Sequence, residues 1–194
     1  MKLQDSLPQG VEVDGKFIKM DFDFRNVLNM IDVLDRKDMI PEAQAYKALC
    51  FVQKRPKNVF QTLAAVKGLL FPGTRKNDQK KVTDFVQDAG LIRAAFRQAY
   101  GIDLYREKLH WIEFTELLSA IPEMTKYSEV VGIRLRPMPE PTKFNQKERE
   151  LLAKAKEAVK IELTAEEREE QVQRDIATMA DFLLKLSEGS AKDG

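Results

Sequence analysis

Residues 11–34 read VEVDGKFIKMDFDFRNVLNMIDVL, and the change of period inside this stretch decides the fold class. Its first half alternates apolar and polar residues on both sides of Asp14-Gly15, a dipeptide that favours the type I′ turn of a β-hairpin. From Phe24 onward the apolar residues recur every three or four positions, which indicates an amphipathic helix, and Asp23 stands where its N-cap belongs. The stretch predicts a small N-terminal hairpin followed by helices.

Five further stretches before residue 137 favour helix. Pro41 is suited to open the first of them, Gly101 to end the third in the left-handed conformation, and Thr125 to cap the last. The predicted helices run from Pro41 to before Pro56, from about Val59 to Pro72, from after Thr83 to about Tyr100, from about Glu107 to Ala120, and over a short stretch after Thr125. We therefore expect a mainly α fold with about six core helices and a small N-terminal β-hairpin.

Proline spacing predicts how the chain is divided. Residues 137–141 read PMPEP, and three prolines in five residues favour an extended, semi-rigid spacer. We expect a helical core domain with the hairpin in residues 1–136, the proline-rich spacer in residues 137–141, and charged C-terminal helices in residues 142–194. The last region holds 10 Lys or Arg residues and 12 Asp or Glu residues.

The C-terminal region contains two helix starts with capping-box spacing, Asn145 with Glu148 and Thr164 with Glu167. Its last predicted helix carries an apolar stripe on one face. The stripe consists of Val172, Ile176, Met179, Leu183 and Leu186. Such a stripe either folds back on the core or meets another chain, and a charged helix behind a proline spacer is well placed for a partner. The stripe is the candidate partner-binding face.

Composition excludes several classes of protein. The 194 residues carry a formal charge of +1, which gives no basic footprint for nucleic acid. No apolar run reaches the roughly 18 residues of a membrane span, and the first residues lack the apolar core of a secretion signal. One Cys and one His exclude a disulfide framework and the usual His/Cys zinc sites, so we expect a reducing cytoplasm, while metal sites made of carboxylates alone stay open.

Four features could carry chemistry, and each also has a structural interpretation. His110 is the only imidazole, and a packing or capping role is expected; Cys50, expected on the apolar face of its helix, could meet it as a nucleophile. The basic stretch Arg75–Lys81 could touch nucleic acid but has no aromatic residues to stack on bases. A sequence cluster of aspartates fits helix caps better than a metal site: Asp21, Asp23, Asp32, Asp35 and Asp38. We expect no enzyme.

One region is more specific than generic helix. It runs from Asp84-Phe85-Val86-Gln87-Asp88-Ala89 through Tyr100-Gly101-Ile102-Asp103-Leu104 and Leu109-His110-Trp111 to Thr125-Lys126 and Gly132-Ile133-Arg134. Together with the N-terminal Val-Asp-Gly hairpin, it resembles a family of siphophage tail proteins from phages and prophages of Gram-positive bacteria. The likeness covers roughly residues 7–141. It makes Tyr100, Gly101, Ile102, Asp103, Leu104, His110, Trp111, Thr125, Lys126 and Arg134 motif residues with a structural role.

The resemblance implies a tail assembly chaperone, encoded beside the tape-measure gene. Such a protein binds the tape-measure protein and keeps it soluble until the tail tube polymerises, and is absent from the finished tail. The expected partners are the tape-measure protein, the tail tube protein and further copies of the chain, in the cytoplasm of the infected bacterial host. Two alternatives stay open: a structural tail accessory protein retained in the virion, and a phage regulatory or nucleic-acid-binding module.

Overall fold

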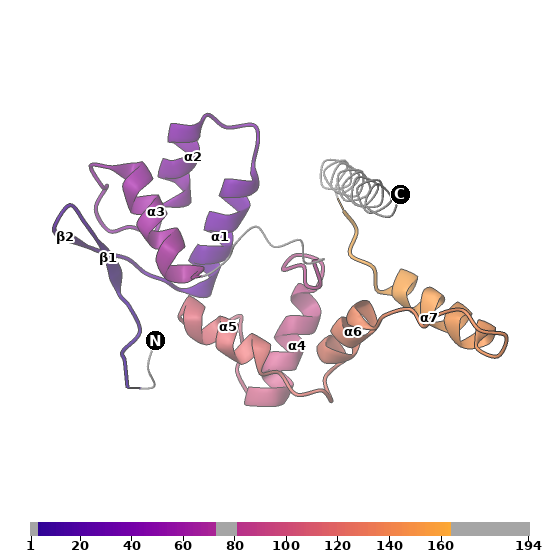
Figure 1. The fold of residues 1–194 in the computed structure, drawn as a ribbon. Coiled ribbons are helices and arrows are strands. Elements are labelled where there is room, and N and C mark those ends of the chain that lie inside the picture. The colour runs from indigo at the N-terminus through magenta and orange to yellow at the C-terminus, as the bar shows by residue number, and fades with distance from the viewer. Residues whose placement is uncertain (1–3, 73–80, 164–194) are drawn as a thin grey trace, which may run out of the picture. The chain divides into compact units, whose positions relative to one another are not determined.

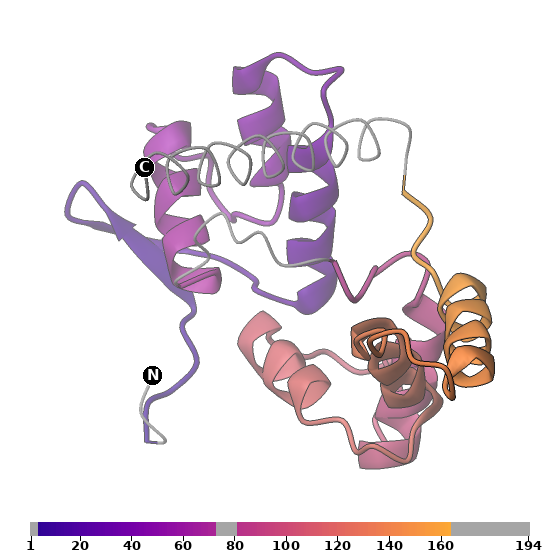
Figure 2. The same cartoon turned by 45° about the vertical axis from the view of Figure 1, so that its right-hand side comes forward.

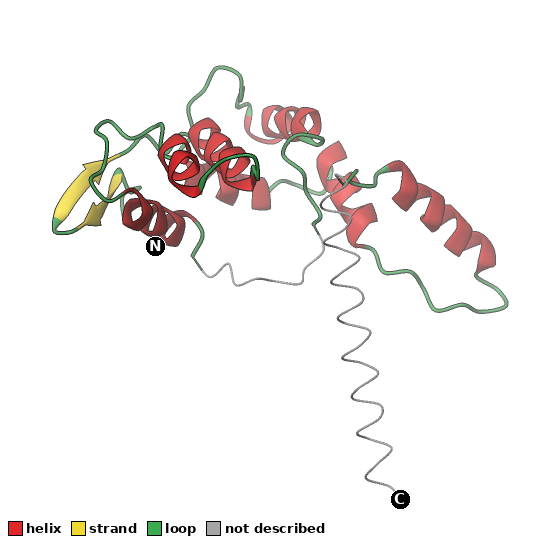
Figure 3. Cartoon of the chain, turned by 90° about the horizontal axis from the view of Figure 1, so that it is seen from above, coloured by secondary structure: helices red, strands yellow, loops and turns green. Residues whose placement is uncertain are grey.

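A computed structural model describes residues 4–72 and 81–163, which contain one two-stranded sheet and seven helices (Figures 1 and 3). The strands are β1 (Gly10–Val13) and β2 (Lys16–Lys19), and the helices are α1 (Phe24–Asp35), α2 (Pro41–Ala48), α3 (Val59–Leu70), α4 (Ala89–Tyr100), α5 (Trp111–Ser119), α6 (Lys126–Leu135) and α7 (Gln146–Ala158). The predicted mainly α fold with an N-terminal hairpin is confirmed.

The chain forms two compact units, Met1–Gly132 and Ile133–Gly194. They divide within α6, a few residues before the predicted boundary between residues 136 and 137. The predicted division concerns a core domain, a spacer and an extension, and it stays a prediction.

The hairpin forms as its turn dipeptide predicts. Asp14 has φ 51° and Gly15 has φ 68°, the two positive values that a type I′ turn requires. The antiparallel pairs run from Gly10 opposite Lys19 to Val13 opposite Lys16. Val11 and Val13 are buried, and β1 packs against α3. The hairpin is therefore stabilised by a helix, as a marginal two-stranded sheet requires.

Helices α1, α2 and α3 form the N-terminal part of the first unit, with α2 packed against both of the others (Figure 1). The predicted N-cap of α1 is present, because the Asp23 carboxylate accepts the Arg25 N–H at 3.0 Å. Pro41 opens α2 as predicted, but this helix ends at Ala48. Gln44 ties α2 to the end of α1 by donating to the carbonyl oxygens of Val33, Leu34 and Arg36.

Helix α4 begins later than the sequence predicted. The Asp84 carboxylate accepts the N–H groups of Val86 and Gln87, both at 2.8 Å, and closes a separate turn before the helix. Asp88 then serves as the N-cap position of α4, which begins at Ala89. An aspartate that bonds to nearby N–H groups competes with helix propagation, which explains the delayed start.

The Asp84 turn makes a pH-dependent contribution to stability. Partial burial raises the pKa of the Asp84 carboxyl. Hydrogen bonds from Lys81, Gln87 and Val86 lower the pKa by more than burial raises it, so the pKa lies below its ordinary value. A depressed pKa in the folded state stabilises the fold above the unfolded pKa of about 3.9 and loses this effect as the pH falls.

We expect Asp84→Asn to be less stable than the wild type at pH 7, with a difference that shrinks as the pH falls below about 4. Urea denaturation at a series of pH values measures this difference. A difference that stays constant between pH 7 and pH 3 would contradict the assignment, because it would show that the charge of Asp84 contributes nothing.

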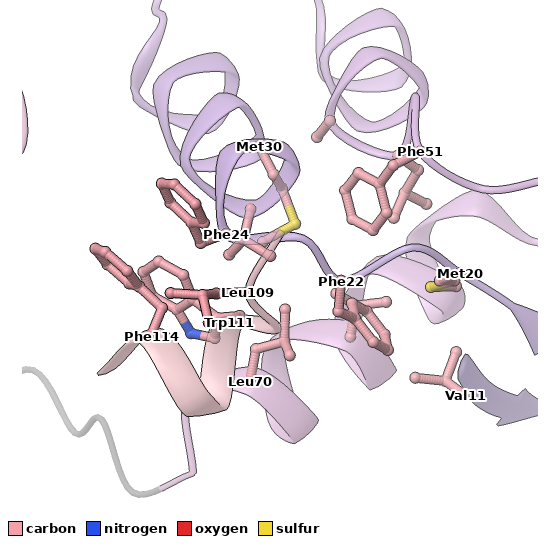
Figure 4. Packing of buried hydrophobic residues seen from close by; sticks show 14 of the residues in the cluster. Val11, Met20, Phe22, Phe24, Met30, Phe51, Leu70, Leu109, Trp111 and Phe114 are labelled. Atoms are coloured by element: carbon pink, nitrogen blue, oxygen red, sulfur yellow. The ribbon is translucent and has the colours of Figure 1, made fainter. Parts of the chain in front are cut away.

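Several aromatic side chains pack against one another in the core of the first unit (Figure 4). Phe114 of α5 stacks on Phe24 of α1 with ring centroids 4.7 Å apart and on Phe96 of α4 at 5.3 Å. Trp111 lies beside Phe114 at 5.8 Å. Figure 4 shows Phe24, Trp111 and Phe114 gathered on one side of the cluster, with Phe22 and Phe51 on the other. Four rings from three helices thus meet at Phe114.

The described part of the second unit consists of the last residues of α6, a loop and α7, which is orange in Figure 2. The Arg134 Nε donates to the Val159 carbonyl oxygen at 2.6 Å, and the Lys156 ammonium donates to the Arg134 carbonyl oxygen at 2.9 Å. The predicted N-cap Asn145 is in place but bonds differently: its Oδ1 accepts the Thr142 N–H, and its Nδ2 donates to the Glu140 carbonyl oxygen. The end of the proline stretch is therefore bonded to the start of α7.

Candidate functional site

The motif segment around His110 is joined to the N-terminal segment by a short antiparallel bridge. The Phe24 N–H donates to the Leu109 carbonyl oxygen at 2.9 Å, and the Trp111 N–H donates to the Phe22 carbonyl oxygen at 2.8 Å. We call residues 21–25 and 103–111 together the junction. It brings together two parts of the chain that are at least 78 residues apart. Sequence reasoning missed this bridge because it predicted helix from Glu107.

Arg25 holds the two sides of the junction together. One guanidinium nitrogen, Nη1, donates to both carboxylate oxygens of Asp23 at 3.0 Å, and the other, Nη2, donates to the carbonyl oxygens of Leu104 at 2.7 Å and Glu107 at 2.8 Å. Asp23 is buried and also caps α1. One arginine therefore connects the start of α1 to the loop after α4.

His110 caps α5 with its ring. Nδ1 accepts the Ile112 N–H at 3.1 Å, and Nε2 lies 3.0 Å from the Pro8 carbonyl oxygen. Because that oxygen can only accept, Nε2 carries the proton and Nδ1 carries none. The backbone of His110 is extended, so α5 begins at Trp111 instead of the predicted Glu107. The predicted capping role of His110 is confirmed.

We expect His110→Ala to lower the free energy of unfolding by about 1 kcal/mol, because the N-cap acceptor is lost. His110→Asn keeps a side-chain acceptor at the cap and should lose clearly less. Chemical denaturation of the two variants beside the wild type measures both effects. Equal losses would contradict the capping role and attribute the effect to ring packing alone.

Cys50 is exposed, so the expectation that it lies buried on an apolar face is wrong. Its helix, α2, ends at Ala48, and the helical spacing used to place Cys50 no longer applies there. Both ring nitrogens of His110 are bonded to backbone groups, so neither is free to activate the thiol in this arrangement. A surface hollow beside His110 is lined by charges of both signs, including the Lys108–Asp21 pair at 3.5 Å.

The remaining motif residues terminate or connect helices. Gly101 ends α4 with φ 72°, as predicted, and the Tyr100 hydroxyl donates to the Leu117 carbonyl oxygen at 2.9 Å. Asp103 accepts the Tyr105 N–H and lies between the guanidinium groups of Arg97 and Arg106. Leu104 is buried, and Ile102 packs against the core.

Thr125 and Lys126 begin α6. The Thr125 hydroxyl accepts the Ser128 N–H at 3.2 Å, which confirms the predicted cap, and Lys126 pairs with Glu129 on the surface. Arg134 lies in the second unit, bonded to Val159. Trp111 is 4% exposed and contacts the rings of Phe71 and Phe85, so its place is the core and not an open surface.

Four large apolar side chains between residues 135 and 151 are open to solvent. These are Leu135, Met138, Phe144 and Leu151, and Phe144 is 97% exposed. On α7, Leu151 lies in a row with Lys147, Lys154 and Ala158, and Phe144 stands before the helix at the same spacing of three or four residues. All five residues are exposed, and we call them the α7 row. The neighbouring face of α7 is the one that packs inward, because Leu152 on that face is buried.

Several predicted features lie outside the described residues. They are Arg75 to Lys80 of the basic stretch, the helix start Thr164 with Glu167, and the apolar stripe Val172, Ile176, Met179, Leu183 and Leu186. Among residues 4–72 and 81–163, no group of three or more His, Cys, Asp or Glu side chains could hold a metal ion. Two members of the aspartate cluster pair with arginines, Asp23 with Arg25 and Asp38 with Arg36. No helix in the described part of the chain has the length and apolarity of a membrane span.

Compared with protein families, the chain matches the one described as Bacteriophage Gp15 protein over residues 3–71 and 67–161. The match covers most of the chain and includes the hairpin, the junction and α7. Comparison with curated proteins and with solved structures finds no match.

Proposed function

The chain belongs to the bacteriophage Gp15 protein family, and we propose that it is a tail assembly chaperone. In this proposal it binds the tape-measure protein and keeps it soluble until the tail tube polymerises. The action is reversible protein–protein binding in the cytoplasm of the infected host, with no catalytic step and no cofactor. The tail tube protein and further copies of the chain are the other proposed partners.

The observation that carries the proposal is the concentration of exposed apolar side chains between residues 135 and 151. Exposed apolar surface of this kind favours association with another protein. The residues around it are rich in lysine and arginine, so an amphipathic helix with acidic flanks is the kind of partner that fits. A long helical protein offers many such segments in succession.

Weak individual contacts suit a partner that must later be released. Many modest contacts along one long molecule give strong overall binding through effective concentration, while each contact stays easy to displace. The growing tail tube can then replace the chaperone one segment at a time. A single isolated tape-measure segment that bound with nanomolar affinity would contradict this part of the proposal.

A structural tail protein that stays in the particle is the alternative closest to the proposal. Quantitative mass spectrometry of infected cells and of purified virions separates the two functions. We expect the chain to be abundant in cells during assembly and absent from finished virions. Stoichiometric presence of the chain in the virion would contradict the chaperone function and support the structural one.

A regulatory or nucleic-acid-binding module is the second alternative, and it depends on the basic stretch Arg75–Lys81. Binding to a mixed-sequence DNA or RNA duplex, measured at increasing salt, tests it. Affinity that falls steeply with salt would support this module, because released counterions are the signature of phosphate contacts. We expect no measurable binding at physiological salt.

A further inference from the structure

We propose that the α7 row is the docking surface for this chain's own C-terminal segment, residues 164–194. The row offers apolar side chains at its two ends and centre, Phe144, Leu151 and Ala158, with Lys147 and Lys154 between them. Leu151 is 68% exposed. Neither lysine has an ion pair within the described residues, so the row presents unpaired positive charge beside open apolar surface.

Charge complementarity identifies the occupant. Residues 133–163 contain eight Lys or Arg residues and five Glu residues, whereas residues 164–194 contain four Lys or Arg residues and eight Asp or Glu residues. The near-neutral sum over the C-terminal region therefore conceals a positive part followed directly by a negative one. Opposite charges on adjacent segments favour their association, and low salt strengthens it.

The two apolar surfaces also agree in length. The row extends from Phe144 to Ala158, and the predicted apolar stripe extends from Val172 to Leu186, each over 14 residue steps. At about 1.5 Å per residue, a helical stripe of this length would be about 21 Å long, and the helical part of the row, from Lys147 to Ala158, is about 16 Å long with Phe144 just before it. A helix laid along α7 would cover the row from end to end.

The position of the last described residues makes this docking accessible to the same chain. Val159, immediately after the row, is held by Arg134, and the chain continues to Leu163 four residues later. Residues 160–171 are then long enough to reverse the chain direction, because helix–helix connections commonly need only two to eight residues. The segment would run antiparallel to α7.

Antiparallel pairing places Leu186 opposite Phe144 and Val172 opposite Ala158. Met179 then falls opposite Leu151. Asp175 and Asp181 come within about one helical turn of Lys154 and Lys147, where they would complete the missing ion pairs. The segment would cover the row until a partner displaces it, so the docking itself requires neither the tape-measure protein nor the proposed chaperone function.

Disulfide trapping in the full-length chain tests the docking. Cys50→Ser removes the only native thiol, and Leu151→Cys with Met179→Cys places one thiol on each surface. We expect an intrachain disulfide under mild oxidation, formed about tenfold faster than in the matched control, Leu151→Cys with Ala177→Cys. Mass spectrometry of peptides from dilute protein identifies the bond as intrachain.

Charge reversal gives a second measurement on the same pair of thiols. Lys147→Glu with Lys154→Glu should slow the disulfide, and adding Asp175→Lys with Asp181→Lys should restore its rate. Equal rates for the two thiol pairs would overturn the proposal. So would a disulfide found only between two chains, because a second copy would then occupy the row. Circular dichroism checks that the exposed substitutions leave the fold intact.

Discussion

Phe114→Ala is expected to lower the free energy of unfolding by about 3–5 kcal/mol, the usual cost of removing a buried aromatic ring. Phe114 is 1% exposed, and its ring lies against Phe24, Phe96, Trp111 and Phe85. These neighbours belong to three helices and the segment before α4. The cavity would therefore form at the point where these helices of the first unit pack together. Urea denaturation measures the loss, and thermal melting should show a drop of roughly 10 °C for a chain of this size.

Phe17→Ala is the control, because it removes the same ring from a largely exposed position. We expect its free energy of unfolding to stay within about 0.5 kcal/mol of the wild-type value. Equal losses in the two variants would contradict the described core. A small loss for Phe114 alone would show that the aromatic cluster does not hold the helices together.

Arg25→Met should produce the second-largest loss, about 2–3 kcal/mol. The methionine keeps the apolar stem but removes the donors to Leu104 and Glu107 and leaves the buried Asp23 carboxylate without its charged partner. The guanidinium is partly exposed, and water replaces some of the lost contacts, so the loss stays below that of a fully buried pair.

Loss of the Arg25 contacts should also loosen the junction locally, and hydrogen–deuterium exchange can detect this loosening. In Arg25→Met, the bridge amides of Phe24 and Trp111 should exchange with deuterium faster than the loss of global stability alone explains. Amides in the middle of α3 should change only by the amount that this global loss explains. Arg25→Lys should recover little, because the single ammonium nitrogen cannot occupy both the Nη1 position beside Asp23 and the Nη2 position beside the two carbonyl oxygens.

Arg36→Met is the control for the Arg25 variant. Arg36 also pairs with a carboxylate two residues away, but both partners are well exposed. The hydrogen bond from Arg36 lowers the pKa of Asp38 to about 2. We expect no resolvable change in the free energy of unfolding, because exposed ion pairs contribute little. A loss as large as that of Arg25→Met would contradict the importance of the junction.

Local signals in the sequence predicted the parts of the fold that depend on neighbouring residues. The turn at Asp14-Gly15, the cap at Asp23 and the end of α4 at Gly101 each require a particular backbone conformation or side-chain acceptor within a few residues. The aromatic and aliphatic periodicity then located the helices. These requirements are chemical and short in range, so a single sequence contains them.

The junction could not be predicted in this way. It pairs residues 22–24 with residues 109–111, and nothing in the periodicity of either segment indicates the other. At two helix starts, hydrogen bonds from side chains to nearby N–H groups also replaced helix by other local structure. His110 bonds back to Ile112 in an extended conformation, as Asp84 does to Val86 and Gln87 in its turn. Competition between side chain and helix explains why two helices begin four or more residues late.

The spacing of the α7 row is visible in the sequence, but it is ambiguous there. Phe144, Leu151 and Ala158 are spaced by seven residues, but Leu152 gives an equally plausible inward face. Only the structure shows that Leu152 is buried and Leu151 is open. The burial of Leu152 thus identifies the face with Leu151 as the exposed one and as a candidate binding surface.

Co-expression of the full-length chain with the tape-measure protein of the same phage tests the proposed function most directly. The measurement is the soluble fraction of the tape-measure protein, followed by affinity pull-down and light scattering of the complex. The variant Ile176→Asp with Leu183→Asp disrupts the apolar stripe, and Gln173→Asp with Ala177→Asp adds the same charge off the stripe.

The chaperone account predicts that the tape-measure protein aggregates alone and is soluble in a complex with the wild-type chain and with the off-stripe control. It predicts renewed aggregation with the stripe variant. A tape-measure protein that stays equally insoluble with and without the chain, while the chain itself remains unbound, would contradict the account.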